Sequence, residues 1–450
     1  MLGESELRRW ADVALGSSTA DQTEVLLFSE HEALTRFANN YIHQNVEETN
    51  VSIRVRVVLG KKIGVATSND ISDGALKALV ERATNLARHQ VENEDFRSLP
   101  KSERAPKVDA FVESTARCGP EERAGVVGQI CQASRDAGLI AAGAFKTTAG
   151  EVAIANSLGT WQYSQETLAD INTVIMGKTG SGYAGRVSMD VADIDGDVIG
   201  REAVDKAQMA QEPRALEPGT YEVILQDYAV SDLLDFFAYL SFGGLAYQEK
   251  RTFMAGRLGE KVMGENVSIW DDGLSGETPP SAFDFEGVVK QRVDFIDRGI
   301  AEGVVWDSYT AGKEKDQAST GHGLPAGSTF GPVPMNMVMA AGDSSLHEMI
   351  RNTKRGIWVT RFWYTRPVHP LNVIVTGMTR DGTFLVEDGQ VKHPVRNLRF
   401  TQGYVEALNH VEAISRERSL QKAIIGQSLV PSLKIGKWEF TGQTEPEASA

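Results

Sequence analysis

Histidine and cysteine are scarce in this chain, and this limits the metal chemistry that it could support. Imidazole and thiolate are common ligands of transition metals, so any such site must draw on a short set. The set is His31, His43, His89, His322, His347, His369, His393, His410, Cys118 and Cys131. Two cysteines are too few for a four-cysteine zinc site or for a framework of several disulfides. We expect a reducing, cytoplasmic environment.

One pair, His347-Glu348, invites comparison with the helical zinc motif of metalloproteases. That motif needs a second histidine one turn later, so that both imidazoles lie on one face of the helix. Arg351 and Asn352 occupy the positions four and five residues after His347, and neither can replace that histidine. We therefore interpret the pair as part of the surface of a helix over residues 344–353.

Three other histidines, His369, His393 and His410, lie fairly close together in the sequence. The patterns around them predict a loop, a strand and a helix, respectively. These placements imply no shared face, so the spacing does not favour a three-histidine metal site. Of the two thiols, we interpret Cys131 as a core residue within a helix and Cys118 as an ordinary loop residue.

Two glycine-containing segments partly match ligand-binding loops. Residues 191–202 place Asp193, Asp195 and Glu202 at positions of a calcium loop, but Val191 stands first and has no oxygen to offer. An acidic turn that caps the next helix is the better interpretation. Residues 177–179 resemble the end of a phosphate loop, yet Asn172 replaces the required first glycine, which favours a turn between strands.

A third polar segment, residues 321–328, reads GHGLPAGS. Loops of this composition often carry binding function, and they are also common as disordered surface loops. The sequence leaves both alternatives open. The Gly-x-Ser-x-Gly elbow of many serine hydrolases does not occur anywhere in the chain.

The balance of charge excludes some partners. The 450 residues include 46 Lys plus Arg and 61 Asp plus Glu, which gives a formal net charge of −15. An acidic surface repels phosphate, so we expect no direct nucleic-acid partner. No apolar run approaches the roughly 20 residues needed to span a bilayer, so we expect no membrane partner either. Residues 1–23 are charged and amphipathic, which predicts a first helix and not a signal peptide.

The order of predicted elements indicates an α+β protein, with a mixed α/β N-terminal half followed by a β-rich C-terminal domain. Alternating apolar residues over 50–59 predict a half-buried strand with Arg54 and Arg56 on its polar face. Apolar residues at helical spacing predict helices over 4–15 and 73–89, and further helices are expected over 121–137 and 404–415. Other strands are expected over 141–149, 151–156, 160–166, 169–179, 424–435 and 438–441, with a hairpin turn at Asp381-Gly382. A Pro-Gly turn near residue 218 marks a domain boundary. We expect the following division: an N-terminal subdomain over 1–90, a middle subdomain over 91–215, a C-terminal domain over 216–441 and a flexible tail over 442–450.

A weak internal repeat runs through the N-terminal half. Asn39 precedes Gly60 by 21 residues, and Asn156 precedes Gly177 by the same interval. Each interval holds a strand that ends in a Gly-Lys turn. This spacing is consistent with a duplicated strand-turn unit or with a chance resemblance between two hairpins.

Residues 228–240 predict a long apolar helix at the start of the C-terminal half. It carries two carboxylates, Asp232 and Asp235, among Phe, Tyr and Leu side chains. Hydrolysis assisted by a metal needs about three protein ligands, an open position and a base. Two carboxylates in such a setting favour a helix whose role is packing.

Several segments of the C-terminal half, taken in order, resemble the TldD/PmbA family of metallopeptidases. The similar segments are residues 252–262 (TFMAGRLGEKV), 336–346 (NMVMAAGDSSL), 356–360 (GIWVT) and 391–400. The resemblance covers most of residues 220–441 and, more weakly, the N-terminal half. In the TldD branch it implies a His-Glu-x-x-x-His motif on the central helix and a later cysteine, which together hold a catalytic metal.

The positions that match this motif, counted back from Gly256 without gaps, are Asp235, Phe236 and Leu240. None reproduces the motif, and no cysteine follows Cys131. The chain therefore looks like the PmbA branch, also called TldE, which lacks the metal site. We accordingly predict no catalytic residue, no cofactor-binding residue and no metal ligand in this chain, and no cofactor.

The resemblance implies a partner and a substrate class. The PmbA branch pairs with a TldD-type subunit to enclose a proteolytic chamber, so we expect such a subunit, or a homodimer, as partner and a peptide or unfolded protein segment as substrate. Two alternatives stay open. One is an autonomous hydrolase of the same family that uses other ligands, such as His322, His369 or His393. The other is a self-associating scaffold or peptide-binding protein.

Overall fold

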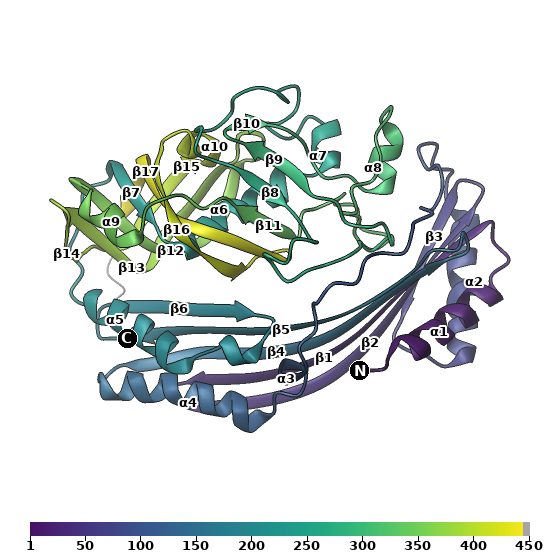
Figure 1. Ribbon diagram of the computed structural model, residues 1–450, viewed down its shortest axis with the longest axis horizontal. Coiled ribbons are helices and arrows are strands. Elements are labelled where there is room, and N and C mark those ends of the chain that lie inside the picture. The colour runs from purple at the N-terminus through teal and green to yellow at the C-terminus, as the bar shows by residue number, and fades with distance from the viewer. Residues whose placement is uncertain (444–450) are drawn as a thin grey trace.

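The computed structural model describes residues 1–443, and the part of the predicted tail over 444–450 lies outside the described residues. The chain folds into a long curved sheet covered on one face by helices and a C-terminal β-rich part that lies over the other face (Figure 1). This is the predicted α+β fold. None of the helices within residues 1–443 is long and apolar enough to cross a membrane.

The sheet of the N-terminal half has six antiparallel strands in the order β3-β2-β1-β4-β5-β6. Its strands are β1 (Gln22–Ala38), β2 (Tyr41–Leu59), β3 (Lys62–Ser68), β4 (Ile140–Asn156), β5 (Trp161–Met176) and β6 (Ser181–Ser188). Side chains alternate between its faces, as strand geometry requires. Val25 and Leu27 of β1 pack toward the helices, whereas Leu26 and Phe28 pack against Phe283 of the C-terminal half.

Helices cover one face of this sheet in two groups (Figure 1). The helical segments are α1 (Glu4–Ser17), α2 (Asp73–His89), α3 (Glu113–Ala116), α4 (Pro120–Asp136), the 3-10 turn η1 (Val191–Asp193) and α5 (Gly196–Met209). Ser72 caps α2 by accepting a hydrogen bond from the Ala75 amide, and Asp195 caps α5 in the same way. The predicted capping turn before α5 is thereby confirmed.

The two helix groups belong to two copies of one structural unit. The order α1-β1-β2-β3-α2 is followed by α4-β4-β5-β6-α5, and the turns that contain Asn39 and Gly60 correspond to those that follow Asn156 and contain Gly177. A Cβ on Gly64 of β3 would lie 2.1 Å from the Ala83 carbonyl of α2. A Cβ on Gly182 of β6 would lie 2.2 Å from the Ala203 carbonyl of α5. The same close contact between strand and helix thus recurs in the two units, which favours a duplicated unit over a chance resemblance between two hairpins.

The C-terminal half contains an 11-stranded sheet whose main path is β10-β9-β8-β11-β17-β15-β13-β12-β7. Its strands are β7 (Gly219–Leu225), β8 (Ile269–Asp271), β9 (Val293–Asp297), β10 (Ile300–Ala301), β11 (Asn336–Met339), β12 (Arg355–His369), β13 (Ile374–Glu387), β14 (Gln390–Pro394), β15 (Leu398–Gly403), β16 (Val411–Lys422) and β17 (Gln427–Gln443). The helical segments here are α6 (Asp227–Leu240), α7 (Gly244–Gln248), α8 (Ser308–Lys313), α9 (Leu346–Arg351), η2 (Pro370–Asn372) and α10 (Tyr404–Leu408). The last strand, β17, pairs with β7, β11, β15 and β16.

Several predicted boundaries are wrong. The breaks expected near Gly150, near residue 167 and near residue 436 do not exist, because β4, β5 and β17 are continuous. The hairpin turn expected at Asp381-Gly382 is a bulge within β13, with positive φ at both residues. The helix expected over 404–415 ends at Leu408, and the chain continues as β16.

The two halves meet through buried charges as well as apolar contacts. Arg56 of β2 forms ion pairs with Glu24 of β1 and with Glu286 of the C-terminal half. The hydroxyl of Ser308 at the start of α8 donates to Glu286 at 2.7 Å. Phe28 and Phe285 pack with ring centroids 5.5 Å apart. These contacts hold the C-terminal half over one face of the N-terminal sheet.

Candidate functional site: the carboxylates of helix α6

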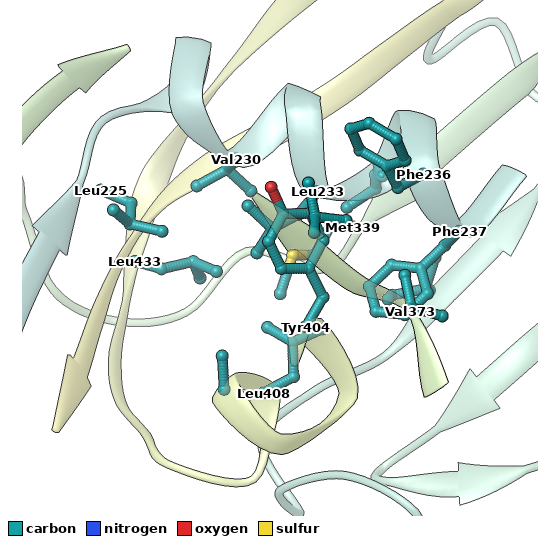
Figure 2. Packing of buried hydrophobic residues seen from close by; sticks show 14 of the residues in the cluster. Leu225, Val230, Leu233, Phe236, Phe237, Met339, Val373, Tyr404, Leu408 and Leu433 are labelled. Carbon is teal, nitrogen blue, oxygen red and sulfur yellow. The ribbon is translucent and has the colours of Figure 1, made fainter. Parts of the chain in front are cut away.

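Helix α6 is the element on which the family resemblance implies a catalytic metal, and here most of its length is buried. Phe237 stacks on Phe242 at 5.6 Å, and Phe236 meets Tyr404 edge-on at 5.9 Å. Figure 2 shows Leu233 next to Tyr404 of α10, with Phe236 and Phe237 in the same apolar cluster. The apolar side of α6 is therefore part of the main core of the C-terminal half, as the packing interpretation predicts.

The positions that match the family's metal motif have side chains that cannot bind a metal. Phe236 is 5% exposed and Leu240 is 9% exposed, and both carry only carbon in their side chains. Asp235 alone offers oxygen at these positions. Within residues 1–443 no group of three His, Cys, Asp or Glu side chains is arranged to hold a metal ion. The residues present thus do not fit a catalytic metal on α6.

The polar side of α6 instead carries three carboxylates that bind neighbouring protein groups. Asp232 accepts hydrogen bonds from the hydroxyls of Tyr404 at 2.9 Å and Thr365 at 2.7 Å. Asp235 accepts one from the Ile424 amide at 3.3 Å. Asp227 accepts from Gln421 at 2.9 Å and also from Ser419. These bonds connect α6 to β12, α10, β16 and the turn after β16.

Burial shifts the protonation of these carboxylates. It raises the pKa of Asp232 to about 6, although the hydroxyls of Thr365 and Tyr404 oppose the shift. Burial and then the neighbouring charge of Asp232 raise the pKa of Asp235 to about 8. Asp235 is thus largely protonated at neutral pH and can donate a proton in a hydrogen bond. Asp232 and Asp235 can therefore take up and release protons near neutral pH. Within residues 1–443 no set of metal ligands lies beside them.

His322 was a candidate ligand, and the structure places it in a buried structural network. Its Nε2 lies 2.8 Å from Asp271 Oδ1, and its Nδ1 lies 2.9 Å from Thr320 Oγ1. The side chains of His322 and Asp271 are 0% exposed. Burial, with the charge of Lys290, lowers the pKa of His322. Both ring nitrogens are in use, so this imidazole cannot reach a substrate.

Asp271 accounts for this network. Burial alone would raise its pKa, but the charges of Lys290 and His322 and the hydrogen bonds that it accepts hold the pKa well below its usual range. Asp271 Oδ2 accepts hydrogen bonds from the backbone amides of Met335 at 2.8 Å and Asn336 at 2.6 Å. No sequence pattern indicates this group, because His322 is 51 residues from Asp271. The interpretation of 321–328 as a disordered surface loop is wrong at its start, where Gly321, His322 and Gly323 are buried.

The remaining candidates lie on separate elements. His369 is exposed at the end of β12, and His393 lies in β14, where its Nδ1 is 3.0 Å from the Pro394 carbonyl. His347 belongs to the short helix α9, as predicted for a surface pair. Cys131 is buried in the core between α4 and the sheet, which confirms the prediction, and Cys118 is also buried before α4.

Comparison with known proteins identifies the family of this chain. Three models of the PmbA/TldA metallopeptidase family match the chain: domain 1 over residues 23–87, the central domain over 119–211 and the C-terminal domain over 218–442. The chain belongs to the PmbA/TldD metallopeptidase family.

Relatives of known name match almost the whole chain. It is 22% identical over 448 residues to a metalloprotease PmbA homolog from Haemophilus influenzae, with 96% of both chains covered. It is 23% identical to metalloprotease PmbA from Escherichia coli O157:H7, with 87% of both covered. The crystal structure of TldE from Thermococcus kodakarensis superposes with a TM-score of 0.89 at 21% identity, covering 97% of this chain and 100% of that one. The last comparison shows a shared fold.

Proposed function

We propose that this protein is the non-catalytic, PmbA/TldE-like subunit of a TldD-type metallopeptidase assembly that acts in proteolysis or peptide processing. The observation that carries the proposal is the state of α6. At the positions where the family's catalytic branch places its ligands, Phe236 and Leu240 are packed into the core. Phenylalanine and leucine side chains carry no donor atom, so these two positions cannot bind a metal in any conformation of the helix.

In this role the subunit would shape and gate a chamber whose metal belongs to the partner. The partner would be a TldD-type subunit, and the substrate would be a peptide or an unfolded protein segment. Likeness in fold to a protein named TldE supports this assignment. The cytoplasmic location, the dimeric state and the division of the chain at residues 90 and 215 are parts of the same proposal.

Co-expression with a TldD-type partner tests the proposal. We expect the two chains to co-purify, the metal to be present at one equivalent per partner chain, and peptidase activity to require both chains. The purified protein alone should hold no stoichiometric zinc and should hydrolyse no peptide. Stoichiometric zinc together with peptidase activity in the protein alone would contradict the proposal.

The autonomous hydrolase is tested separately with histidine variants. If the chain hydrolysed peptides by itself through His369 or His393, replacing each with alanine would abolish that activity while leaving the fold intact. His322→Ala is unsuitable as a single test, because it also breaks the buried bond to Asp271. A pull-down that recovers only further copies of this chain would favour the scaffold alternative.

A further inference from the structure

One half of strand β2 has no neighbour on its outer edge. β3 pairs with β2 only over residues 53–59, where Ile53 lies opposite Ser68 and Leu59 opposite Lys62. Residues 41–52 pair with β1 on their other side and have no strand partner beyond, within residues 1–443. Residues 41–50 are all exposed. An unpaired edge of this length presents a row of free amides and carbonyls.

The second structural unit has the same gap in the equivalent strand, and there the chain fills it. β6 pairs with β5 only over 169–176, which leaves residues 161–168 without a strand partner on that side. The segment 100–112, which forms neither helix nor strand, lies along this edge. The Thr167 amide donates to the Ala110 carbonyl at 2.9 Å, and the Ala105 amide donates to Gln162 Oε1 at 2.9 Å. The Val112 amide donates to Thr167 Oγ1 at 3.0 Å.

The two units thus differ in one respect: β5 has an extended segment along the outer edge of its first half, and β2 has none. The fold already accepts an extended polypeptide along the outer half of one middle strand, and the other middle strand offers the same geometry without an occupant from this chain. We propose that residues 41–52 of β2 bind an extended peptide that adds as a further strand to the sheet. The site is distinct from α6 and needs no catalytic group in this chain.

The edge has the properties that such a site requires. The sequence of residues 41–52 is YIHQNVEETNVS, which contains β-branched residues and no Pro or Lys to discourage pairing. The strand is held from behind, because the buried Arg123 of α4 donates to Thr35 of β1 and to Asn45 of β2 at 3.2 and 3.3 Å. A rigid edge loses little conformational freedom on binding.

Charge at the edge selects the kind of peptide. Glu47 and Glu48 are both exposed, and Glu30 of β1 lies exposed opposite Asn50. The basic side chains of β1 beside this edge are Arg36, which bonds Gln44, and His31, which lies 3.3 Å from Glu47, whereas Arg123 is buried behind the strand. Cross-strand pairs of opposite charge stabilise a sheet, whereas like charges opposite each other destabilise it. The occupant is therefore an extended segment that carries Lys or Arg among β-forming residues.

Binding of a synthetic peptide to the full chain alone tests the proposal. The probe is a fluorescent ten-residue peptide with alternating Lys and Val, and binding is measured by anisotropy together with amide hydrogen exchange. We expect slower exchange over residues 41–52 when the peptide is bound. Peptides with N-methyl groups on alternate residues give the sharpest comparison. Methylation of the set of amides that face β2 should abolish binding, whereas methylation of the other set should preserve it.

Two matched charge variants complete the experiment. Glu47→Lys with Glu48→Lys should weaken binding of the cationic peptide by about tenfold, because the carboxylate on the same face as the peptide lysines becomes an ammonium and its attraction turns into repulsion. Glu81→Lys with Glu92→Lys makes the same change of charge at exposed positions away from the edge and should alter binding by less than about twofold. Equal effects of the two double variants would show that only net charge matters, and this would overturn the proposal.

Two further outcomes would also overturn it. If residues 41–52 are already protected from exchange in the free protein and the protein is a dimer, a second copy of this chain occupies the edge. If both N-methylated peptides bind equally well, the peptide does not add as a strand. The measurement uses this chain alone, so its result does not depend on whether a metallopeptidase partner exists.

Discussion

At the scale of single residues, the carboxylates of α6 are held by protein groups where the resembling family would hold a metal. Asp232 accepts hydrogen bonds from Tyr404 and Thr365, and Asp235 accepts one from the Ile424 amide. The sequence was sufficient to locate Asp232 and Asp235 and to show that Phe236 and Leu240 are not ligands. It could not show the bonds of these carboxylates, because their partners are more than 130 residues away in the chain.

Asp235 predicts a pH-dependent stability. Its folded-state pKa of about 8 exceeds its usual value of 3.8, so the contribution of this group is fully present below pH 4 and is lost as the pH rises toward 8. Asp235→Asn removes the cost of ionising a buried carboxyl. We expect the variant to equal the parent near pH 4 and to exceed its free energy of unfolding by about 2–4 kcal/mol at pH 8.5.

Chemical denaturation at several pH values measures this difference. Asp205→Asn serves as the control, since Asp205 is exposed on α5. A constant difference between the Asp235 variant and the parent from pH 4 to 8.5 would contradict the assigned pKa.

At the scale of elements, local patterns predicted the helices better than the strands. The helices expected at 4–15, 73–89 and 121–137 appear within two residues of those bounds, because each has an apolar face at helical spacing. The sequence divided β4 and β5 into shorter strands, because Gly150 and the polar residues near 166 suggested breaks. Strand pairing with both neighbours overrides these local signals.

The repeated contact between strand and helix gives a prediction at this scale. Gly64→Ala would place a Cβ against the Ala83 carbonyl and the Ala87 amide, and Gly182→Ala would do the same against Ala203 and Ala207. Backbone cannot move aside as a flexible side chain can. We expect each variant to lose about 1–3 kcal/mol of unfolding free energy.

A glycine in open surroundings supplies the control. Gly128 is exposed within α4, and a Cβ there meets nothing within 4 Å. Gly128→Ala should stabilise the protein by about 0.5–1 kcal/mol, because alanine favours the helix. Thermal unfolding of the three variants measures these changes in stability. If Gly64→Ala lost stability and Gly182→Ala did not, the two units would not be equivalent in packing.

At the scale of the whole molecule, buried ions between the two halves fix how the C-terminal part lies on the sheet. Arg56 joins Glu24 on β1 to Glu286 in the C-terminal half, and Ser308 supports Glu286 with both its amide and its hydroxyl. The sequence predicted an alternating strand that carries Arg54 and Arg56 on one face. It could not predict that this face is covered, because the partner of Arg56 lies 230 residues later.

Removing Arg56 tests this interface. Arg56→Ala leaves two buried carboxylates without a cation, and we expect a loss of about 3–5 kcal/mol in the free energy of unfolding. Hydrogen exchange should become faster at residues 24–28 and 283–289, on both sides of the interface. Arg88→Ala, at an exposed position of α2, is the control and should change stability by less than about 0.5 kcal/mol.

If instead the Arg56 variant kept the parent's stability and exchange, the ion pairs would be incidental to how the halves are held together. A loss of stability without faster exchange at 283–289 would place the effect within the N-terminal sheet alone.

The position of β17 has a consequence for synthesis on the ribosome. The N-terminal sheet is complete once residue 209 has emerged, because its strands pair with neighbours from the same half. The C-terminal sheet has β17 in its middle. The pairings of β7, β11, β15 and β16 with β17 can therefore form only after residues 427–443 have emerged. At about 5–20 residues per second, synthesis from residue 209 to residue 443 takes about 10–50 s. During that time α6 and its apolar side are without their final cover, and the nascent chain is then most dependent on chaperones.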